Sequence, residues 1–307
     1  MKNRLVGKDI VSINELGKQD ILNIISVTKK LKTSPKNNLL KGKILASCFF
    51  EPSTRTRLSF EAAMQRLGGS VIGFSDPNIT SFKKGESLHD SIKVIGQYVD
   101  IIAIRHFLEG TAQIAGEATN KPVINCGDGS NQHHTQTLID LFTIRECQKK
   151  IDGLHIAIVG DLKNGRGIHS LVQGLKHFKV YLYFVAPDIV QMPASFCDEL
   201  RRHNIRFSFH KKTEEIITKV DILYLIRMQE ERFPSRAEYE KVKHAFFLTL
   251  PMLAGVKQNF KILHIMPRIC EMDTAIDETK YAYYFQQAEN GLYVRQALLA
   301  LLLLGKI

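Results

Sequence analysis

The chain has 307 residues, and 42 Lys+Arg against 31 Asp+Glu give it a formal net charge of +11. At roughly 100–200 residues per domain, this length predicts two domains, each with an apolar core of its own. Hydrophobic residues make up 44% and charged residues 24% of the chain, values that exclude a disordered or fibrous protein.

Strands and helices alternate along the first part of the chain. No secretory signal follows Met1, and apolar residues at helical spacing predict a helix over 13–32. Short β-rich runs then predict strands over 43–50, 70–74, 100–105 and 122–126, separated by helices over 53–67, 87–98 and 110–118. This alternation is typical of a parallel sheet that helices cover on both faces.

A second series of strands and helices follows. Strands are predicted over 155–160, 179–186, 205–209, 221–226 and 261–264, and helices over 135–149, 167–178, 193–202 and 237–245. A long final helix over 281–304 contains the longest apolar run, 297–304, which is too short to span a membrane. The predicted fold class is α/β, with two doubly wound parallel-sheet domains, a boundary near residue 133, and ligands at the carboxyl ends of strands in the cleft between the domains.

The most informative motif is Ser53-Thr54-Arg55-Thr56-Arg57, which follows an apolar strand and Pro52. Hydroxyls and free backbone N–H groups at the start of a helix bind phosphate well, and guanidinium groups add paired charge-assisted hydrogen bonds. The motif therefore predicts a phosphate site. The alternative interpretation is a capped helix whose arginines are simply exposed to solvent.

Three shorter patterns are weaker signals. Ser81 and Lys84 belong to a basic loop before a helix, and Arg105 ends an apolar strand where a long cation reaches a cleft. His133 and Gln136 lie at a helix entrance after a turn-rich loop, where both side chains are able to face a ligand. Taken alone, the basic loop is by default a solvated loop, and a lone histidine at a helix entrance is more often structural.

Several other functions are not supported by the sequence. It contains no P-loop, no complete dinucleotide fingerprint, no nucleophile elbow and no H-E-x-x-H motif. The basic run over 29–43 lacks aromatic residues for base stacking, so it predicts a solvated helix end rather than a nucleic-acid site. Five widely spaced cysteines without a C-x-x-C pair predict reduced thiols and no metal site. We expect a cytoplasmic protein without membrane contact.

Six motifs in order resemble the aspartate/ornithine transcarbamoylase family over nearly the whole chain. The first three are the Ser53 motif, the loop from Ser81 to Glu86, and His133 to Gln136. The other three resemble the aspartate branch of the family and comprise 160–166, the Arg-x-Gln-x-Glu-Arg pattern over 227–232, and 264–268. Two positions depart from the usual pattern, because His134 and Ile265 stand where the family has proline. Loss of the fixed φ of proline at Ile265 is expected to leave the loop of Ile265 and Met266 less preorganised.

The resemblance implies an enzyme that transfers the carbamoyl group of carbamoyl phosphate to the α-amino group of L-aspartate, in pyrimidine biosynthesis. Phosphate is already a good leaving group, so the resemblance implies no metal or cofactor. The protein's task is to hold two mutually repelling anions together and to stabilise the tetrahedral intermediate. Residues 1–133 with the helix over 289–307 would bind carbamoyl phosphate, and residues 134–288 would bind aspartate.

Site residues follow from the matched motifs. The implied carbamoyl phosphate site consists of Ser53, Thr54, Arg55, Thr56, Arg105, His133, Gln136, Ile265 and Met266. The implied aspartate site consists of Ser81, Lys84, Arg166, Arg227, Gln229 and Met266. Among these, Arg55, Thr56, Arg105, His133 and Lys84 would act in catalysis.

The resemblance also implies partners. The active unit would be a homotrimer in which Ser81 and Lys84 come from the adjacent chain, and a zinc-containing regulatory chain is a further expected partner. Two alternatives remain open: transfer to another amino acid such as ornithine, which requires an acidic pocket, and a basic nucleic-acid-binding module without catalysis, which requires a continuous basic face.

Overall fold

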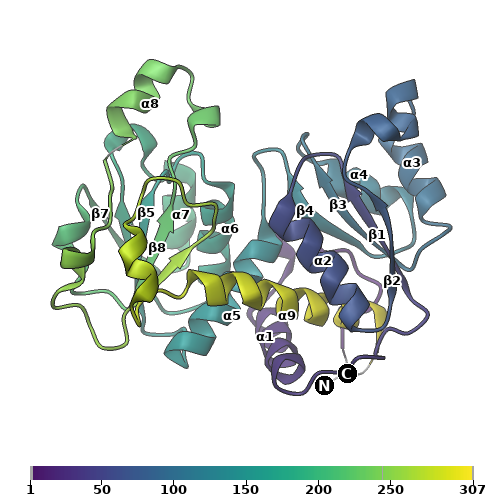
Figure 1. Cartoon of the computed structure of the whole chain (residues 1–307), viewed down its shortest axis with the longest axis horizontal. Coiled ribbons are helices and arrows are strands. Elements are labelled where there is room, and N and C mark those ends of the chain that lie inside the picture. Colours follow the sequence, from purple (N-terminus) through teal and green to yellow (C-terminus); the bar gives the residue numbers. More distant parts are fainter. Residues whose placement is uncertain (1–2, 244, 306–307) are drawn as a thin grey trace. The chain divides into compact units, whose positions relative to one another are not determined.

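The computed structural model describes residues 3–243 and 245–305, which form two compact units (Figure 1). Unit 1 comprises residues up to 142 and from 289 onward, and unit 2 comprises residues 143–288. The first division lies inside a helix, later in the chain than the expected boundary at 133. The start of that helix packs within unit 1, since Ile139 lies against Gly291 and Lys32 lies over the Phe142 ring.

Unit 1 is built on a four-stranded parallel sheet of order β2-β1-β3-β4. Its strands are β1 (Ile44–Phe49), β2 (Ser70–Phe74), β3 (Ile101–His106) and β4 (Val123–Asp128). Its helices are α1 (Lys18–Thr33), α2 (Thr54–Arg66), α3 (Leu88–Ile95) and α4 (Thr111–Ala118), with parts of α5 (His134–Gln148) and α9 (Tyr284–Leu303). Alternate residues of β1 and β3, such as Ala46 and Ile102, pack with Ile92 of α3 and Ala115 of α4 in one buried cluster.

Unit 2 is built on a five-stranded parallel sheet of order β7-β6-β5-β8-β9. Its strands are β5 (His155–Gly160), β6 (Tyr181–Val185), β7 (Arg206–His210), β8 (Ile222–Ile226) and β9 (Lys261–His264). The helices wholly within it are α6 (Arg166–Leu175), α7 (Ala194–Arg202) and α8 (Arg236–Val242). Residues of β8 are buried throughout, as expected for a central strand covered on both faces.

Strand order places one switch point in each sheet. In unit 1 the chain goes from β1 to β2 on one side of β1 and then to β3 on the other side. In unit 2 it goes from β5 to β6 and β7 on one side of β5 and then to β8 on the other side. Loops that leave the two central strands diverge at such a point and open a crevice at the carboxyl ends, where ligands of α/β sheets bind. These positions are therefore where functional residues are expected in each unit.

Each strand predicted from the sequence is present, with ends that differ by at most two residues. The helix predicted over 13–32 is wrong in its first turn, which is a separate 3-10 turn, Ile13–Glu15. The break follows from Gly17, which is extended and donates its N–H to the Asp20 carboxylate (3.1 Å), so that α1 begins at Lys18.

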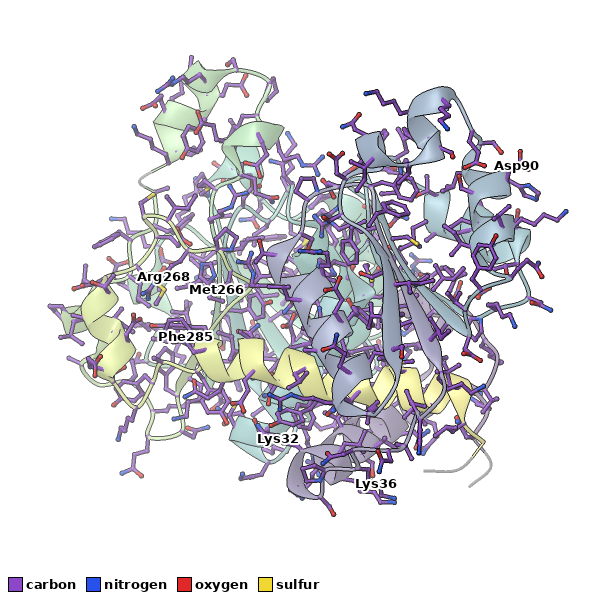
Figure 2. All side chains as sticks on the ribbon, turned by 45° about the vertical axis from the view of Figure 1, so that its right-hand side comes forward. Lys32, Lys36, Asp90, Met266, Arg268 and Phe285 are labelled. Atoms are coloured by element: carbon purple, nitrogen blue, oxygen red, sulfur yellow. The ribbon has the colours of Figure 1, made fainter. Side chains whose placement is uncertain are left out.

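The basic run at the end of α1 has two kinds of lysine. Lys29 and Lys30 are exposed, as expected for a solvated helix end. Lys32, in contrast, donates to Asn290 of α9 (2.7 Å) and lies over the Tyr293 ring (5.5 Å), so it fastens α1 to α9 within unit 1 (Figure 2). Among the helices of residues 3–243 and 245–305, none is both long and apolar enough to cross a membrane.

Candidate active site

In unit 1 the first candidate element is the start of α2, directly after β1. Ser53 is the N-cap in an extended conformation, and its side chain makes no capping hydrogen bond to the helix. Thr54 and Arg55 are exposed, whereas Thr56 is buried. The first turn therefore presents hydroxyls and backbone N–H groups where the helix dipole is positive, which is the arrangement that binds phosphate.

Arg105 joins this element from β3. The register of the two strands pairs Arg105 with Phe49, and the Phe50 N–H donates to the Arg105 carbonyl (2.8 Å). The Arg105 guanidinium contacts the Glu51 carboxylate (Nη2 to Oε2, 2.9 Å). Partial burial, and then the positive charge of Arg105, lower the pKa of the Arg55 guanidinium. Two cations close enough to repel each other favour an anion of more than one charge between them.

His133 and Gln136 are positioned by the turn from β4 into α5. Asp128, the last residue of β4, is opposite His106 of β3, and its carboxylate accepts from Gly110 N–H (2.9 Å), which fixes the loop conformation. His133 lies immediately before α5, and the Gln136 side-chain nitrogen donates to Asp140 (2.8 Å). That bond orients the Gln136 amide and leaves its oxygen as the atom suited to accept from a ligand NH₂ group.

Ser81 and Lys84 lie on a 3-10 turn, Ser81–Lys84, and both side chains are exposed. An aromatic contact anchors the turn, because the Phe82 ring packs edge-on against Phe50 (centroids 5.6 Å apart) at the end of β1. Anchoring through Phe82 leaves the side chains of Ser81 and Lys84 on the outside of the turn, where they are accessible to a ligand or to another chain.

In unit 2, Arg166 is the first residue of α6, which follows the central strand β5. Gly160 ends β5 with φ of +126°, and a Cβ there would lie 1.9 Å from the Ile226 carbonyl oxygen of β8. Only glycine permits so close an approach of the two strand ends. The next residue, Asp161, is fully buried and accepts N–H groups from Asn164 (3.0 Å) and Gln229 (3.4 Å). Asp161 thus joins the loop before Arg166 to the loop after β8.

Arg227 and Gln229 follow β8 on that second loop. The Arg227 guanidinium is paired with the Glu231 carboxylate (Nη1 to Oε2, 3.0 Å) and also donates to the Met228 carbonyl (3.2 Å). The hydrogen bond that Arg227 donates to Glu231, partly opposed by burial, raises the pKa of Arg227. The Gln229 side-chain nitrogen is buried without a hydrogen-bond partner among the described residues. A polar ligand that accepted from this amide would satisfy it.

The loop after β9 completes the group in unit 2. Met266 has φ of +55°, and the Met266–Pro267 peptide is cis. The Ile265 side chain lies against α6, since a Cβ on Gly167 would be 2.3 Å from its Cδ1 atom. Ile265 is therefore adjacent to Arg166 in the fold, although about a hundred residues separate them along the chain.

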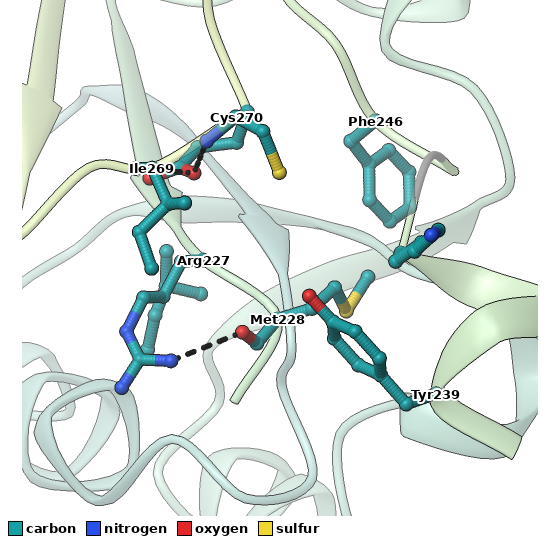
Figure 3. A pocket seen from close by; sticks show the side chains of 9 residues that line it. Arg227, Met228, Tyr239, Phe246, Ile269 and Cys270 are labelled. Atoms are coloured by element: carbon teal, nitrogen blue, oxygen red, sulfur yellow. Dashed lines mark hydrogen bonds between the residues drawn. The ribbon is translucent and has the colours of Figure 1, made fainter. Parts of the chain in front are cut away.

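A pocket beside Arg227 lies between the loops after β8 and β9 and helix α8 (Figure 3). Its lining is mixed apolar and charged and comprises Ile226, Arg227, Met228, Tyr239, Lys243, Phe246, Ile269, Cys270 and Glu271. Two of these side chains, Arg227 and Lys243, are cationic and one, Glu271, is anionic, so the lining has a net positive charge. Within residues 3–243 and 245–305, no three His, Cys, Asp or Glu side chains are grouped to hold a metal ion.

The structure thus places two groups of the expected residues at strand ends, one group in each unit. Around the β1 and β3 ends lie the start of α2 and Arg105, and around the β5 and β8 ends lie Arg166, Arg227 and the loop after β9. Sequence reasoning missed the acidic partners Glu51, Glu231 and Asp161. Of these, Glu51 and Asp161 had a detectable signal, since each is an acidic residue that directly follows an apolar strand.

Comparison with known protein families gives two matches that together span most of the chain. Residues 8–146 match the carbamoyl-P binding domain of aspartate/ornithine carbamoyltransferase. Residues 152–302 match the Asp/Orn binding domain of the same family. The second match includes most of α9, whose residues from 289 onward are packed in unit 1.

Individual relatives agree with the family match. The chain is 52% identical over 306 residues to the aspartate carbamoyltransferase catalytic subunit of Vibrio campbellii, with 99% of each sequence covered. Its structure resembles the catalytic subunit of M. jannaschii aspartate transcarbamoylase, with a TM-score of 0.89, 46% identity, and coverage of 95% of this chain and 97% of that chain. It also resembles the Trypanosoma cruzi enzyme in complex with N-(phosphonacetyl)-L-aspartic acid, with a TM-score of 0.92, 33% identity and 98% of each chain covered.

Proposed function

The chain belongs to the aspartate/ornithine carbamoyltransferase family, and on this premise we propose that it carbamoylates the α-amino group of L-aspartate. Carbamoyl phosphate is the donor, and N-carbamoyl-L-aspartate and phosphate are the products, as in the committed step of de novo pyrimidine biosynthesis. The observation that carries the proposal is the pair of arginines, Arg55 and Arg105, beside the start of α2 at the switch point of unit 1.

In the proposed carbamoyl phosphate site, Ser53, Thr54, Arg55 and Thr56 hold the phosphate. Hydroxyls, backbone N–H groups and a guanidinium at one helix start supply the donors that a phosphate dianion requires. Arg55 stabilises the leaving oxygen, and Arg105, Thr56 and His133 polarise the carbonyl. Donors aimed at the developing negative charge lower the barrier most when they are preorganised. The Gln136 amide and the backbone carbonyls of Ile265 and Met266 bind the carbamoyl NH₂ group.

In the proposed aspartate site, the substrate carboxylates are held by Arg166, Arg227 and Gln229, with contributions from Lys84, Ser81 and Met266. Guanidinium groups bind carboxylates in a bidentate manner. The Gln229 side-chain nitrogen, which lacks a hydrogen-bond partner within residues 3–243 and 245–305, supplies a further donor. Two cationic side chains in one unit favour a dicarboxylate over an amino acid with a cationic side chain. This preference separates aspartate from ornithine as the acceptor.

Assembly and location are part of the proposal. We propose a homotrimer in which Ser81 and Lys84 act in the site of the adjacent chain, and the exposure of both side chains supports this. A zinc-containing regulatory chain is the proposed further partner. A cytoplasmic location is supported by the five free cysteines at positions 48, 126, 147, 197 and 270, since free thiols persist in a reducing compartment.

Carbamoyl transfer measured colorimetrically with L-aspartate and, in parallel, with L-ornithine tests the proposed reaction. Product from aspartate alone supports it, whereas product from ornithine alone, or from neither acceptor, contradicts it. The shared site is tested by mixing the inactive variants Lys84→Ala and Arg55→Ala and allowing subunits to exchange. If sites are shared, some sites in mixed trimers contain neither substitution and activity returns. A mixture that stays inactive after exchange contradicts the sharing.

A further inference from the structure

We infer that His264 and Glu271 form a buried clamp that positions the backbone of Ile265 and Met266 for carbamoyl transfer. The two would be positioning residues, because neither is expected to touch substrate. The inference rests on the proposed function, in which the carbonyls of residues 265 and 266 contact the carbamoyl group. The evidence is a set of hydrogen bonds in the loop from 264 to 271.

The clamp begins with a direct contact between the two side chains. His264 is the last residue of β9, and its side chain is fully buried, while the Glu271 side chain is 8% exposed. Their Nε2 and Oε1 atoms lie 2.6 Å apart. The His264 backbone is itself anchored, because its N–H donates to the Gln287 side chain (2.8 Å). The imidazole therefore projects from a fixed strand end.

The hydrogen bonds determine the tautomer of His264. The Met266 backbone N–H donates to Nδ1 (2.8 Å), so Nδ1 carries a lone pair and no hydrogen. The ring hydrogen is then on Nε2, which donates to the Glu271 carboxylate. Glu271 thus selects the tautomer that is able to accept from Met266. Met266 has φ of +55°, a conformation that residues other than glycine rarely adopt, and this bond helps to hold it there.

The second carboxylate oxygen fixes the other end of the loop. Glu271 Oε2 accepts hydrogen bonds from the backbone N–H groups of Ile269 (3.0 Å) and Cys270 (2.9 Å). Both residues are labelled in Figure 3. One carboxylate therefore gathers both ends of the loop. The main chain of Glu271 is held in turn, since its carbonyl accepts from the Leu248 N–H (3.0 Å). The clamp thus links the end of β9, the loop from 264 to 271 and Leu248 through hydrogen bonds.

Three substitutions separate the bonds of the clamp. His264→Asn keeps an acceptor near the Nδ1 position but does not reach Glu271, and His264→Gln keeps a donor near the Nε2 position but loses the acceptor for Met266. Glu271→Gln keeps the shape of the side chain. Its NH₂ group must face either the ring hydrogen of His264 or the N–H groups of residues 269 and 270, so one set of bonds is lost in either orientation.

The assay is steady-state kinetics of the full chain, with sites counted by titration with N-(phosphonacetyl)-L-aspartate. His264→Gln and Glu271→Gln are expected to raise KM for carbamoyl phosphate about 10- to 100-fold, the range for a lost hydrogen bond to a charged or positioned group. His264→Asn is expected to raise it less, since the bond to Met266 is retained. The matched control is His155→Gln, which removes the Nδ1 partner of the Tyr183 hydroxyl (2.9 Å) at the opposite, amino end of the unit 2 sheet.

If the clamp were merely structural, its substitutions would lower stability and the number of titratable sites, as in the control, and leave the KM of the remaining sites unchanged. That result for both His264→Gln and Glu271→Gln would overturn the inference, as would a larger KM in His264→Asn than in His264→Gln. If either His264→Gln or Glu271→Gln does not fold, the KM of the other still decides between a positioning role and a merely structural one. An inactive wild-type chain would instead contradict the proposed function, so the two failures are distinguishable.

Discussion

Replacing His134 by proline is expected to make the protein more resistant to acid. His134 is the first residue of α5 and is fully buried, and its two ring nitrogens have no hydrogen-bond partner among the described residues. Burial, opposed by the nearby charge of Asp128, lowers its pKa to about 4. Proline suits the first position of a helix, because its φ is already helical and its missing N–H is not needed there.

The sign and size of the effect follow from proton linkage. An unfolded histidine has a pKa of about 6.5, so below that pH the unfolded chain binds a proton that folded His134 does not. Stability therefore falls as the pH falls from about 6.5 to about 4, and the loss from His134 is about 2 kcal/mol at pH 5 and close to zero at pH 8. The substitution also leaves a cavity and stiffens the backbone, but these two effects change stability equally at both pH values. They therefore cancel when the difference between variant and wild type is compared between the two pH values.

Urea unfolding at pH 8 and pH 5, followed by far-UV circular dichroism because the chain has no tryptophan, measures this difference. We expect the gain in unfolding free energy of His134→Pro over wild type to be about 2 kcal/mol larger at pH 5 than at pH 8. His89→Asn, which removes an exposed imidazole from the same unit, is the matched control. An equal gap between His134→Pro and wild type at both pH values would refute the reasoning.

Three further outcomes are expected. Arg55→Ala should lower kcat about 10²- to 10³-fold in steady-state assays, as loss of one electrostatic stabiliser does, and a tenfold or smaller effect would contradict its proposed role. Arg227→Ala should raise KM for aspartate about 10- to 100-fold, while an equal rise in KM for carbamoyl phosphate would show that the two sites are wrongly assigned. Asp221→Ala should cost about 3 kcal/mol in urea unfolding, since the buried carboxylate accepts from His155 N–H (2.9 Å) and from two side chains. Burial would raise the pKa of Asp221, but these bonds lower it, so the stability that Asp221 adds to the wild type is lost only as the pH falls below about 4. An unchanged urea midpoint of Asp221→Ala at pH 7 would contradict the expected loss of stability.

Much of the fold could be predicted from the sequence because its signals are local. Strands such as β8, which is buried throughout, appear as short apolar runs, and helix starts such as α2 are marked by Ser and Thr. The order of strands in each sheet was not predicted, since it depends on contacts between residues far apart in the chain. The break at Gly17 was also missed, because it depends on how Asp20 bonds to that backbone.

The candidate site divides in the same way. The phosphate motif at Ser53 is contiguous and was recognised from its chemistry, whereas Arg166 and Arg227 were identified only through a family resemblance. The clamp of His264 and Glu271 was not predicted, because neither residue has a local signal of a bond between them. Pairing of Arg105 with Glu51 was missed for the same reason, since the contact depends on the register of β1 and β3.

These internal ion pairs have a consequence for substrate affinity. Arg105 already holds Glu51, and Arg227 already holds Glu231, so in the proposed sites a substrate anion gains each guanidinium by exchange with a carboxylate of the same unit. The free energy that each arginine contributes to binding is then reduced by the strength of the internal ion pair that it gives up. Exchange of this kind limits ground-state affinity and returns the carboxylate to the arginine as product leaves. Such a site favours turnover over retention of its ligands.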